Sequence, residues 1–491
     1  METGLIDVSE YQLPDIGRLI VAANYLLMTE LIKQIEYCLD LQLSSTNWLE
    51  TMMIAETAAC TKLEQLSASF GLLSFNTMKV ECIPSVEKLF WYLSHPYLDT
   101  SSELDVFKFG MKWFLLHKET GAHALLIILG CLDMKKLTIK DLIVIRAYLL
   151  KSHFESFPEK VVECLLKVSE DSQVISESVM ISKMESLTEM FTGRVYVEVV
   201  NLVRQSNERK LTYTPVVPMW MLNKKDFKQD FVPHYMYTFT ENLGFERWLE
   251  VADKNLWGWS VVSWGANKLV VVGGEHGRGT GSFMRDVKVY DTLRKEWINH
   301  GVQLPPRRHG GVAILGDNLF LRSFSKLPKL PDAIQSPAIC TYKGEVYVAG
   351  QQNIYKLEES MEGNDKWVTA ITTQIRVNRM TAFKDYIYCS QNYFTQMYRF
   401  KPGVCVNLEH DQLLAFTRPL CIQDAFLDNR IYVEKYRGQT EEESKIVLTV
   451  TQSQFTVNDV AGCCTLVLDM PPLHKHVSQY HQKYLSQCSQ F

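Results

Sequence analysis

The feature that most constrains this chain is a short strand-like pattern that returns through its second half. Each copy has a polar turn followed by apolar, β-branched or aromatic residues, as in 267-NKLVVVGG-274, 317-DNLFL-321, 344-GEVYVAG-350, 385-DYIYCS-390 and 429-NRIYV-433. Most copies recur at roughly 40–50 residues, the repeat length of propeller blades. Small sheets repeated at this spacing bury their faces only against neighbouring copies, so the pattern predicts a β-propeller.

Two further signals accompany the best copy. The pair Gly273-Gly274 allows a sharp turn after an inner strand, where side chains would collide. Tyr290 precedes Trp297 by seven residues. The same or a looser Tyr…Trp spacing recurs at Tyr213 and Trp220, Tyr237 and Trp248, and Tyr355 and Trp367. From these copies we expect a propeller of about five to seven blades.

One repeat is too short. Equivalent strand positions are separated by steps of 50, 27, 41 and 44 residues, and they are Leu269, Leu319, Val346, Ile387 and Ile431. In 316-GDNLFLRSFSKLPKLP-331, Leu321 is followed directly by Arg322. The glycine pair, the Tyr and the Trp that a full repeat would have at this point are absent. We interpret GDNLFL as the first strand of a unit and RSFSKLPKLP as its last, which predicts a truncated blade with unpaired strand edges.

From residue 13 to about 190 the apolar residues have a helical period instead. One face of an amphipathic pattern is formed by Ile16, Leu19, Ile20, Ala23 and Leu27. Asn47 with Glu50 three residues later predicts a capped helix start. Seven or eight helices fit this half, and a second apolar face is formed by Leu104, Phe107, Met111 and Phe114.

Composition argues against several classes of protein. The 51 Lys and Arg against 56 Asp and Glu give a net charge of −5 without a long basic block, so neither a nucleic-acid nor a membrane-surface role is expected. The run 124-ALLIILGCL-132 is too short to span a bilayer, and the acidic N-terminus does not resemble a secretion signal. The 12 Cys are scattered without a C-x-x-C pair, which favours reduced thiols in the cytoplasm, with the nucleus also compatible.

A helical half followed by Gly-Gly…Tyr-x6-Trp repeats resembles the Kelch-like (BTB–BACK–Kelch) family. The opening TGLIDVSEYQLPDIGRLIVAANYLLMTELIKQIEYCLDLQL resembles the last helices of a BTB domain, and SSTNWLETMMIAETAACTKLEQLSASF with SELDVFKFGMKWF resembles a BACK domain. The best Kelch-like blade combines 269-LVVVGG-274 with 288-KVYDTLRKEW-297.

The fold class implied is α plus all-β multidomain. We expect a BTB remnant at 1–40, a BACK helical domain at 41–165, a helical linker at 166–190, a Kelch propeller with one truncated blade at 191–470 and a polar tail at 471–491. Most of the BTB domain is missing from this arrangement, as in a shortened isoform or an incomplete gene model.

The resemblance implies a substrate-recognition adaptor of a cullin-3 RING ubiquitin ligase, with no enzymatic activity and no cofactor. In that family the BTB domain dimerises and, with the first BACK helices, holds the cullin, while the propeller binds the target. The missing BTB part is expected to weaken both homodimerisation and cullin binding, although residues 13–60 retain an auxiliary contact. The alternatives are a scaffold associated with actin or the cytoskeleton, and a form that binds targets without the cullin.

In the family the target meets one mouth of the propeller. The matching positions here are Trp259, Arg278, Arg308, His309, Ser336, Arg379 and Arg418. Arginines at equivalent places of the ring suit an acidic peptide through paired carboxylate contacts, although ion pairs with neighbouring loop acids explain them equally well. A copper-oxidase propeller is a third alternative, but His234, His276, His300, His309 and His410 do not recur at equivalent positions, and no metal site is expected.

Overall fold

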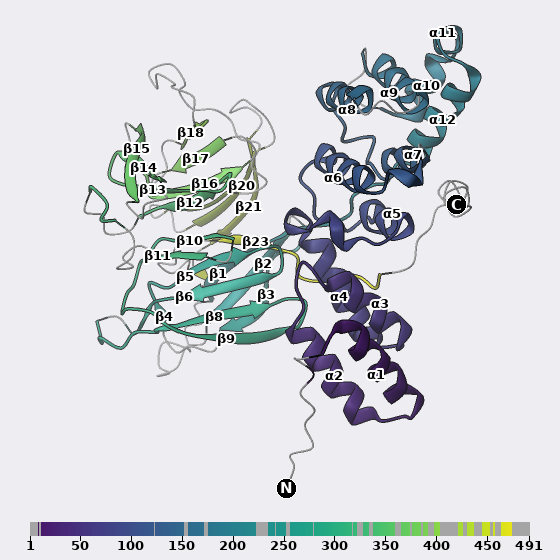
Figure 1. Ribbon diagram of the computed structural model, residues 1–491. Coiled ribbons are helices and arrows are strands. Elements are labelled where there is room, and N and C mark those ends of the chain that lie inside the picture. Colours follow the sequence, from purple (N-terminus) through teal and green to yellow (C-terminus); the bar gives the residue numbers. More distant parts are fainter. Residues whose placement is uncertain are drawn as a thin grey trace. The chain divides into compact units, whose positions relative to one another are not determined.

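A computed structural model describes residues 8 and 11–473 of the chain, with gaps. The gaps are 122, 152–155, 171–174, 222–233, 241, 252–255, 278, 317, 322–327, 333–336, 359–364, 374–375, 384–385, 391–396, 403–420, 426–429, 437–443, 452–454 and 457–462. The chain divides into a helical unit, Met1–Thr212 with Asp469–Phe491, and a sheet unit, Tyr213–Leu468. The predicted class of helices followed by an all-β part is therefore confirmed (Figure 1).

The described part of the helical unit contains twelve α-helices, more than the seven or eight expected, because several are short. They are α1 (Leu13–Tyr25), α2 (Thr29–Leu41), α3 (Trp48–Thr57), α4 (Thr61–Leu73), α5 (Val86–Ser94), α6 (Glu103–Leu116), α7 (His123–Gly130), α8 (Ile139–Lys151), α9 (Ser156–Ser169), α10 (Glu177–Ser182), α11 (Met184–Met190) and α12 (Gly193–Arg204). Single 3-10 turns lie at Phe75–Thr77, Val80–Cys82 and Lys118–Thr120.

The apolar faces predicted from the helical period form two cores. Ile16, Ile20 and Ala23 of α1 are buried, and the first two pack in a small core formed with α2, α3 and α4. Leu19 and Leu27, predicted for the same face, are instead 37% and 80% exposed, and Leu27 follows the end of α1 at Tyr25. The larger core extends from α3 to α12 and includes Trp48 and Trp113, each 1% exposed. Asn47 does precede α3 as expected, but its side chain bonds backward to Ser44 and Gln42 rather than capping the helix.

The expected start of the propeller at residue 191 is wrong. Residues 193–204 form α12, whose buried Val195, Val199 and Leu202 are spaced by four and three residues. Valine-rich segments favour strands by local preference, but this helical spacing lets the segment cover the core, and packing decides the outcome. The first strand begins at Thr214 instead.

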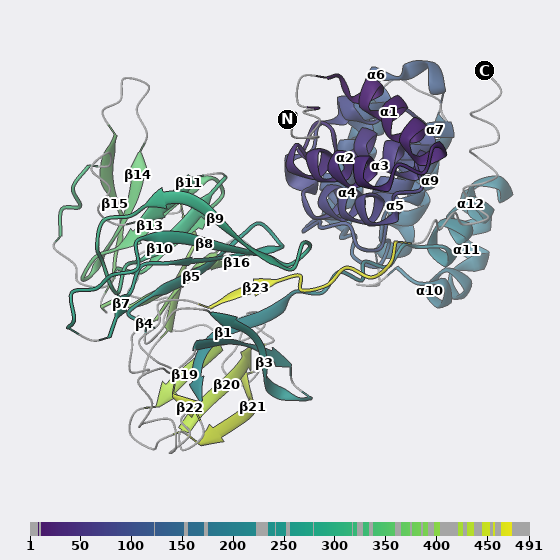
Figure 2. The same ribbon diagram turned by 90° about the horizontal axis from the view of Figure 1, so that it is seen from below.

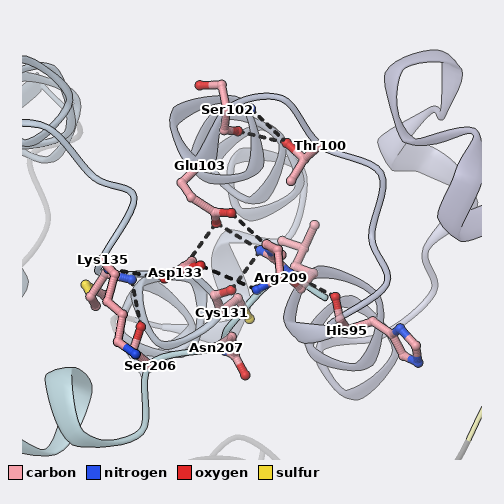
Figure 3. A network of polar contacts seen from close by, with 12 residues as sticks. His95, Thr100, Ser102, Glu103, Cys131, Asp133, Lys135, Ser206, Asn207 and Arg209 are labelled. Atoms are coloured by element: carbon pink, nitrogen blue, oxygen red, sulfur yellow. Dashed lines mark hydrogen bonds and ion pairs between the residues drawn. The ribbon is translucent and has the colours of Figure 1, made fainter. Parts of the chain in front are cut away.

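Residues 206–210, which follow α12, are fixed to the helical unit by a buried ion pair. Arg209 and Glu103, whose side chains are 3% and 2% exposed, meet through two parallel contacts of 2.9 Å (Figure 3). The guanidinium also donates to three backbone oxygens, of Leu93 and His95 at 2.9 Å and of Cys131 at 3.1 Å. All five N–H groups of Arg209 are thereby satisfied, the condition for a stable buried arginine.

Neighbouring residues extend this attachment. Ser206 accepts a bond from the Met134 backbone at 2.8 Å, and Asn207 donates to the Gly130 oxygen at 2.7 Å. The Lys210 backbone donates to the Pro96 oxygen at 2.7 Å. The segment that leads to the first strand is therefore held along its length up to residue 210.

The sheet unit consists of small antiparallel sheets arranged as a β-propeller. Its strands are β1 (Thr214–Met221), β2 (His234–Thr240), β3 (Gly244–Val251), β4 (Leu256–Trp257), β5 (Ser260–Trp264), β6 (Lys268–Val272), β7 (Glu275–His276), β8 (Asp286–Asp291), β9 (Glu296–Gln303), β10 (Val312–Leu315), β11 (Asn318–Leu321), β12 (Ile339–Tyr342), β13 (Glu345–Ala349), β14 (Asn353–Glu358), β15 (Lys366–Thr372), β16 (Arg379–Phe383), β17 (Tyr386–Ser390), β18 (Met397–Phe400), β19 (Cys421–Ala425), β20 (Arg430–Tyr436), β21 (Ser444–Thr451), β22 (Phe455–Thr456) and β23 (Cys464–Leu466).

Four consecutive sheets, those that begin with β5, β10, β12 and β16, meet along their first strands. The sheets are β5-β6-β8-β9, β10-β11, β12-β13-β14-β15, β16-β17-β18 and β19-β20-β21, with a separate β4-β7 pair. β10 lies between β5 and β12, and β12 lies next to β16. The late strand β23 pairs with β1 in the sheet β1-β2-β3 and adjoins β5, which joins the end of the propeller chain to its beginning (Figure 2).

The best Kelch-like repeat has the expected local structure. Gly273 and Gly274 follow β6 with φ of +66° and +102°, and a Cβ on Gly274 would lie 2.8 Å from Leu256. Tyr290 and Trp297 stand opposite one another on β8 and β9, with ring centroids 5.3 Å apart. Tyr213 and Trp220 differ, because Tyr213 immediately precedes β1 and Trp220 lies within it, so their equal spacing does not mark the same hairpin.

The short repeat corresponds to a sheet with only two described strands, β10 and β11. The five equivalent positions all fall on the second strand of their sheets, which confirms the alignment of the repeats. GDNLFL is therefore a second strand, not the first, and Gly316 with φ of +57° makes its turn from β10. Residues 322–327 lie outside the described part, and residues 328–330 form no strand, so the described part of RSFSKLPKLP does not bear out a last strand.

Candidate functional site

Three loops of the propeller meet around Arg308. The first carries β4, the second carries β7 between β6 and β8, and the third connects β9 to β10. Trp257 of β4 pairs directly with Glu275 of β7. We call Trp257, Glu275, Arg308 and His309 the Arg308 cluster.

Backbone contacts hold the third loop against the sheet of β5. The His309 N–H donates to the Gly258 oxygen at 2.6 Å, and the Gly274 N–H donates to the Arg307 oxygen at 2.9 Å. The Ser260 hydroxyl donates to the Gly310 oxygen at 2.6 Å. These bonds fix the backbone on both sides of Arg308, so the loop presents its side chain at a defined place.

Gly258 is required for this close approach. Its φ is +68°, and a Cβ at this position would lie 2.8 Å from the Arg308 Cβ and 3.1 Å from the His309 nitrogen. Such contacts are shorter than side chains tolerate, and positive φ also disfavours other residues. The glycine between Trp257 and Trp259 therefore allows Arg308 to lie against β4.

The Arg308 guanidinium has one acidic and one aromatic neighbour. It forms an ion pair with Glu275 and lies over the Trp257 ring, 4.6 Å from the centroid. Its side chain is 42% exposed, whereas that of Glu275 is 2% exposed. The contact with the ring and the ion pair restrict where the guanidinium lies, and its exposed part remains accessible to a carboxylate, which a planar guanidinium binds with two bonds.

Glu275 is held as an anion. A hydrogen bond from the Gly281 N–H at 2.7 Å lowers its pKa most, burial opposes this, and the Gly279 N–H and Arg308 lower it further. The ionised carboxylate is buried and orients Arg308 through their ion pair. It also compensates part of the positive charge of Arg308. The cluster therefore presents an oriented guanidinium with a moderate, not a strong, positive potential.

His309 completes the cluster by a second contact with Trp257. Its ring stands edge-on to that indole, with centroids 4.5 Å apart at 87°. Its backbone has φ of +53°, a conformation that few residues other than glycine adopt. The bond from the His309 N–H to the Gly258 oxygen at 2.6 Å holds the backbone in this conformation.

The other predicted mouth residues are not all brought together. Trp259 is 1% exposed and packs in the core with Val261 and Leu269, so it is not available to a partner. Arg379 is exposed at the start of β16, and its guanidinium donates to the Asn378 oxygen. Arg278, Ser336 and Arg418 lie outside the described residues, so the predicted ring of arginines rests on Arg308 and Arg379 alone.

Sequence reasoning missed Trp257 and Glu275. Both stand beside predicted features, because Trp257 precedes Gly258-Trp259 and Glu275 follows the glycine pair. A signal was present in the order Gly-Gly-Glu, which places an acid at the end of a sharp turn near the mouth. Its pairing with an arginine 33 positions later could not be read without the fold.

Three findings concern metal binding, one thiol and membrane spanning. No group of three or more His, Cys, Asp or Glu side chains in that part of the chain could hold a metal ion. Burial raises the pKa of the Cys340 thiol to about 12, so this cysteine stays protonated and unreactive at neutral pH. Within the described ranges no helix is both long and apolar enough to cross a membrane.

Comparison with known proteins adds no assignment. No family model and no curated protein matches the chain. Among solved structures, a crystal structure of a nidogen/laminin complex matches 52% of this chain and 100% of that chain, at 11% sequence identity and a TM-score of 0.31. A likeness at that score supports no conclusion about fold or function.

Proposed function

We propose that this chain is a protein-recruiting adaptor of the Kelch-like class, in which the propeller holds a target protein and the helical unit holds a cullin-3 type ligase scaffold. The observation that carries the proposal is the Arg308 cluster. It is a preoriented guanidinium, partly exposed, on rigid loops of a propeller, and loops on a rigid scaffold are the usual place of binding residues.

The cluster favours a target segment that carries Asp or Glu. A carboxylate that approaches the exposed part of Arg308 gains charge-assisted hydrogen bonds, each worth about 1.5–3 kcal/mol. Trp257 adds an apolar surface for the side chain next to that carboxylate. The adaptor performs no reaction; it raises the local concentration of the target near whatever the helical unit binds.

The helical unit supports the other half of the proposal. The residues at the turn between α1 and α2 are exposed apolar side chains, Tyr25 at 87%, Leu26 at 64% and Leu27 at 80%. These belong to residues 13–60, the segment for which the family resemblance implies an auxiliary contact with the cullin. Exposed apolar side chains in sequence are typical of a surface that another protein covers. We place this activity in the cytoplasm, where the free cysteines of the chain stay reduced.

Capture of purified cullin-3 tests the adaptor role. The chain is compared with a version that carries a complete BTB domain at its N-terminus, and with Leu26→Asp/Leu27→Asp as a matched surface variant. The adaptor role predicts capture by the unaltered chain and loss with the double aspartate. Capture by the grafted version alone would assign the chain to the alternative role, a scaffold or competitor that binds targets without delivering them.

A further inference from the structure

The segment after β23 leaves the sheet unit and ends on the helical unit. The Val467 N–H donates to the Ala266 oxygen at 2.8 Å, and the Thr292 hydroxyl donates to the Val467 oxygen at 2.7 Å. From Asp469 onward the chain belongs to the helical unit. Met470 and Leu473 pack there against the larger helical core. We call residues 469–473 the strap.

The side chain of Gln65 forms two hydrogen bonds with the backbone of the strap. The Gln65 carboxamide of α4 donates to the Pro471 oxygen at 3.0 Å and accepts from the Leu473 N–H at 2.9 Å (Figure 1 shows the yellow segment beside α4). A carboxamide that uses its donor and its acceptor on residues i and i+2 recognises an extended main chain. This recognition does not depend on the side chains of the peptide.

The sequence of the strap suits this contact. Pro471 and Pro472 have no N–H groups, so Leu473 supplies the first N–H after Met470, and Gln65 accepts it. Two consecutive prolines also restrict the backbone to extended conformations, which lowers the entropy lost on docking. Met470 and Leu473 then supply an apolar anchor at each end.

A pocket of about 370 Å³ continues the groove beside the strap. Helices α3, α4 and α5 form its walls, and Pro472 and Leu473 form one border. The remaining lining residues are Met52, Glu56, Thr61, Glu64, Gln65, Ala68, Glu87, Lys88 and Trp91. Between-helix pockets of this size hold ligand side chains in other proteins, and the strap leaves this volume empty.

We propose that the groove of α3, α4 and α5 is a docking site for an extended protein segment with two prolines between apolar anchors, and that the strap is its built-in occupant. A segment of the same chemistry from another protein competes with the strap for Gln65 and for the core contacts of Leu473. The pocket lets such a segment carry a larger side chain than the strap does. The site is separate from the Arg308 cluster and does not rest on the adaptor role.

Tethering decides when the site is open. A segment of the same chain acts at an effective concentration on the order of millimolar, so a free peptide of equal affinity binds only when present at comparable concentration. Weakening the strap therefore makes the site accessible without changing the groove. The proposal predicts opposite effects for strap and groove substitutions.

Binding of a fluorescent peptide, 467-VLDMPPL-473, to the full chain tests this. Met470→Ser/Leu473→Ser in the chain is expected to tighten peptide binding at least tenfold relative to the unaltered chain. Adding Gln65→Ala is expected to reverse that gain, and Gln65→Glu, which keeps the acceptor but loses the donor, to reverse it in part. Lys62→Ala, also on α4, serves as the control and is expected to leave binding unchanged.

Equal peptide binding by the unaltered and strap-substituted chains would overturn the proposal, as would indifference to Gln65→Ala. Circular dichroism at 222 nm verifies that each variant keeps its helices. Hydrogen exchange of the Leu473 amide gives a second readout on a chain that retains the strap. The amide is expected to be protected in the unaltered chain and to exchange at least tenfold faster with Gln65→Ala, and an unprotected amide in the unaltered chain counts against docking.

Discussion

Removing the guanidinium of Arg209 is expected to destabilise the helical unit by about 3–5 kcal/mol, the usual cost of breaking a buried ion pair from one side. Arg209→Met leaves the Glu103 carboxylate, 2% exposed, with its bond from the Asp133 N–H but without its cation. It also removes the donors to the oxygens of Leu93, His95 and Cys131. The methionine replaces part of the lost packing, which limits the effect to this range.

Urea unfolding followed at 222 nm measures the change, because the helices lie in this unit. The double variant Arg209→Met/Glu103→Met is the matched control, since it leaves no buried charge, and it is expected to cost less than Arg209→Met alone. Limited proteolysis should show faster cleavage between residues 205 and 213 in the single variant. A cost below about 1 kcal/mol, or a double variant less stable than the single one, would refute the reasoning.

Three further predictions concern pH, a glycine and the order of unfolding. Burial, with a smaller effect of Arg209, lowers the pKa of His95 to about 4, so the unfolded chain binds a proton first as pH falls. The stability due to neutral His95, on the order of 3 kcal/mol at most, is therefore present above pH 6.5 and lost toward pH 4. In urea titrations, the free energy of unfolding of His95→Gln should change less between pH 6.5 and 4 than that of the unaltered chain. Gly258→Ala is expected to destabilise the propeller by about 1–3 kcal/mol and to weaken binding at Arg308. Gly265→Ala is the control, because Gly265 has φ of +63° but no atom near its Cβ, so this variant measures the backbone strain alone. Equal losses of stability in denaturant melts of the two variants would contradict the role of close contact. Calorimetry should resolve two transitions with the propeller first, because the sheet of β10 and β11 has only two strands among the described residues. One cooperative transition at high temperature would oppose this.

Hydrophobic period was enough to predict the order of the two units. The strand positions around Leu269 and Val346 could be aligned because each has the same turn and the same alternation. The predicted boundary between the two units was wrong at α12. Its valine-rich sequence favours a strand by local preference, and packing against the helical core makes it a helix. The first sheet also could not be read, because its strand β23 comes from the far end of the propeller sequence. Pairings across such separations are set by closure of the ring and leave no local signal.

The candidate site could be predicted from the sequence only in part, because some of its contacts also join residues far apart in the chain. Arg308 and His309 are predicted as mouth residues from their position before a repeat strand, and they do lie in the loop that leads to β10. Trp259 was placed there by the same rule, but the chain reverses its face at Gly258 and sends this indole into the core. The strap crosses the predicted boundary at residue 470 between propeller and polar tail, because the apolar pair Met470 and Leu473 is too short to form a period.

The most direct test of the central claim is binding of an acidic peptide to the propeller through Arg308. Fluorescence anisotropy with a peptide that carries Glu and Asp is compared between the unaltered chain, Arg308→Ala and Lys366→Ala. Lys366 is an exposed cation on β15, so its removal changes net charge equally. The account predicts that Arg308→Ala weakens binding about ten- to a hundredfold, as expected for the loss of charge-assisted bonds, while Lys366→Ala has little effect. Equal effects of the two variants, or no binding by the unaltered chain, would contradict it.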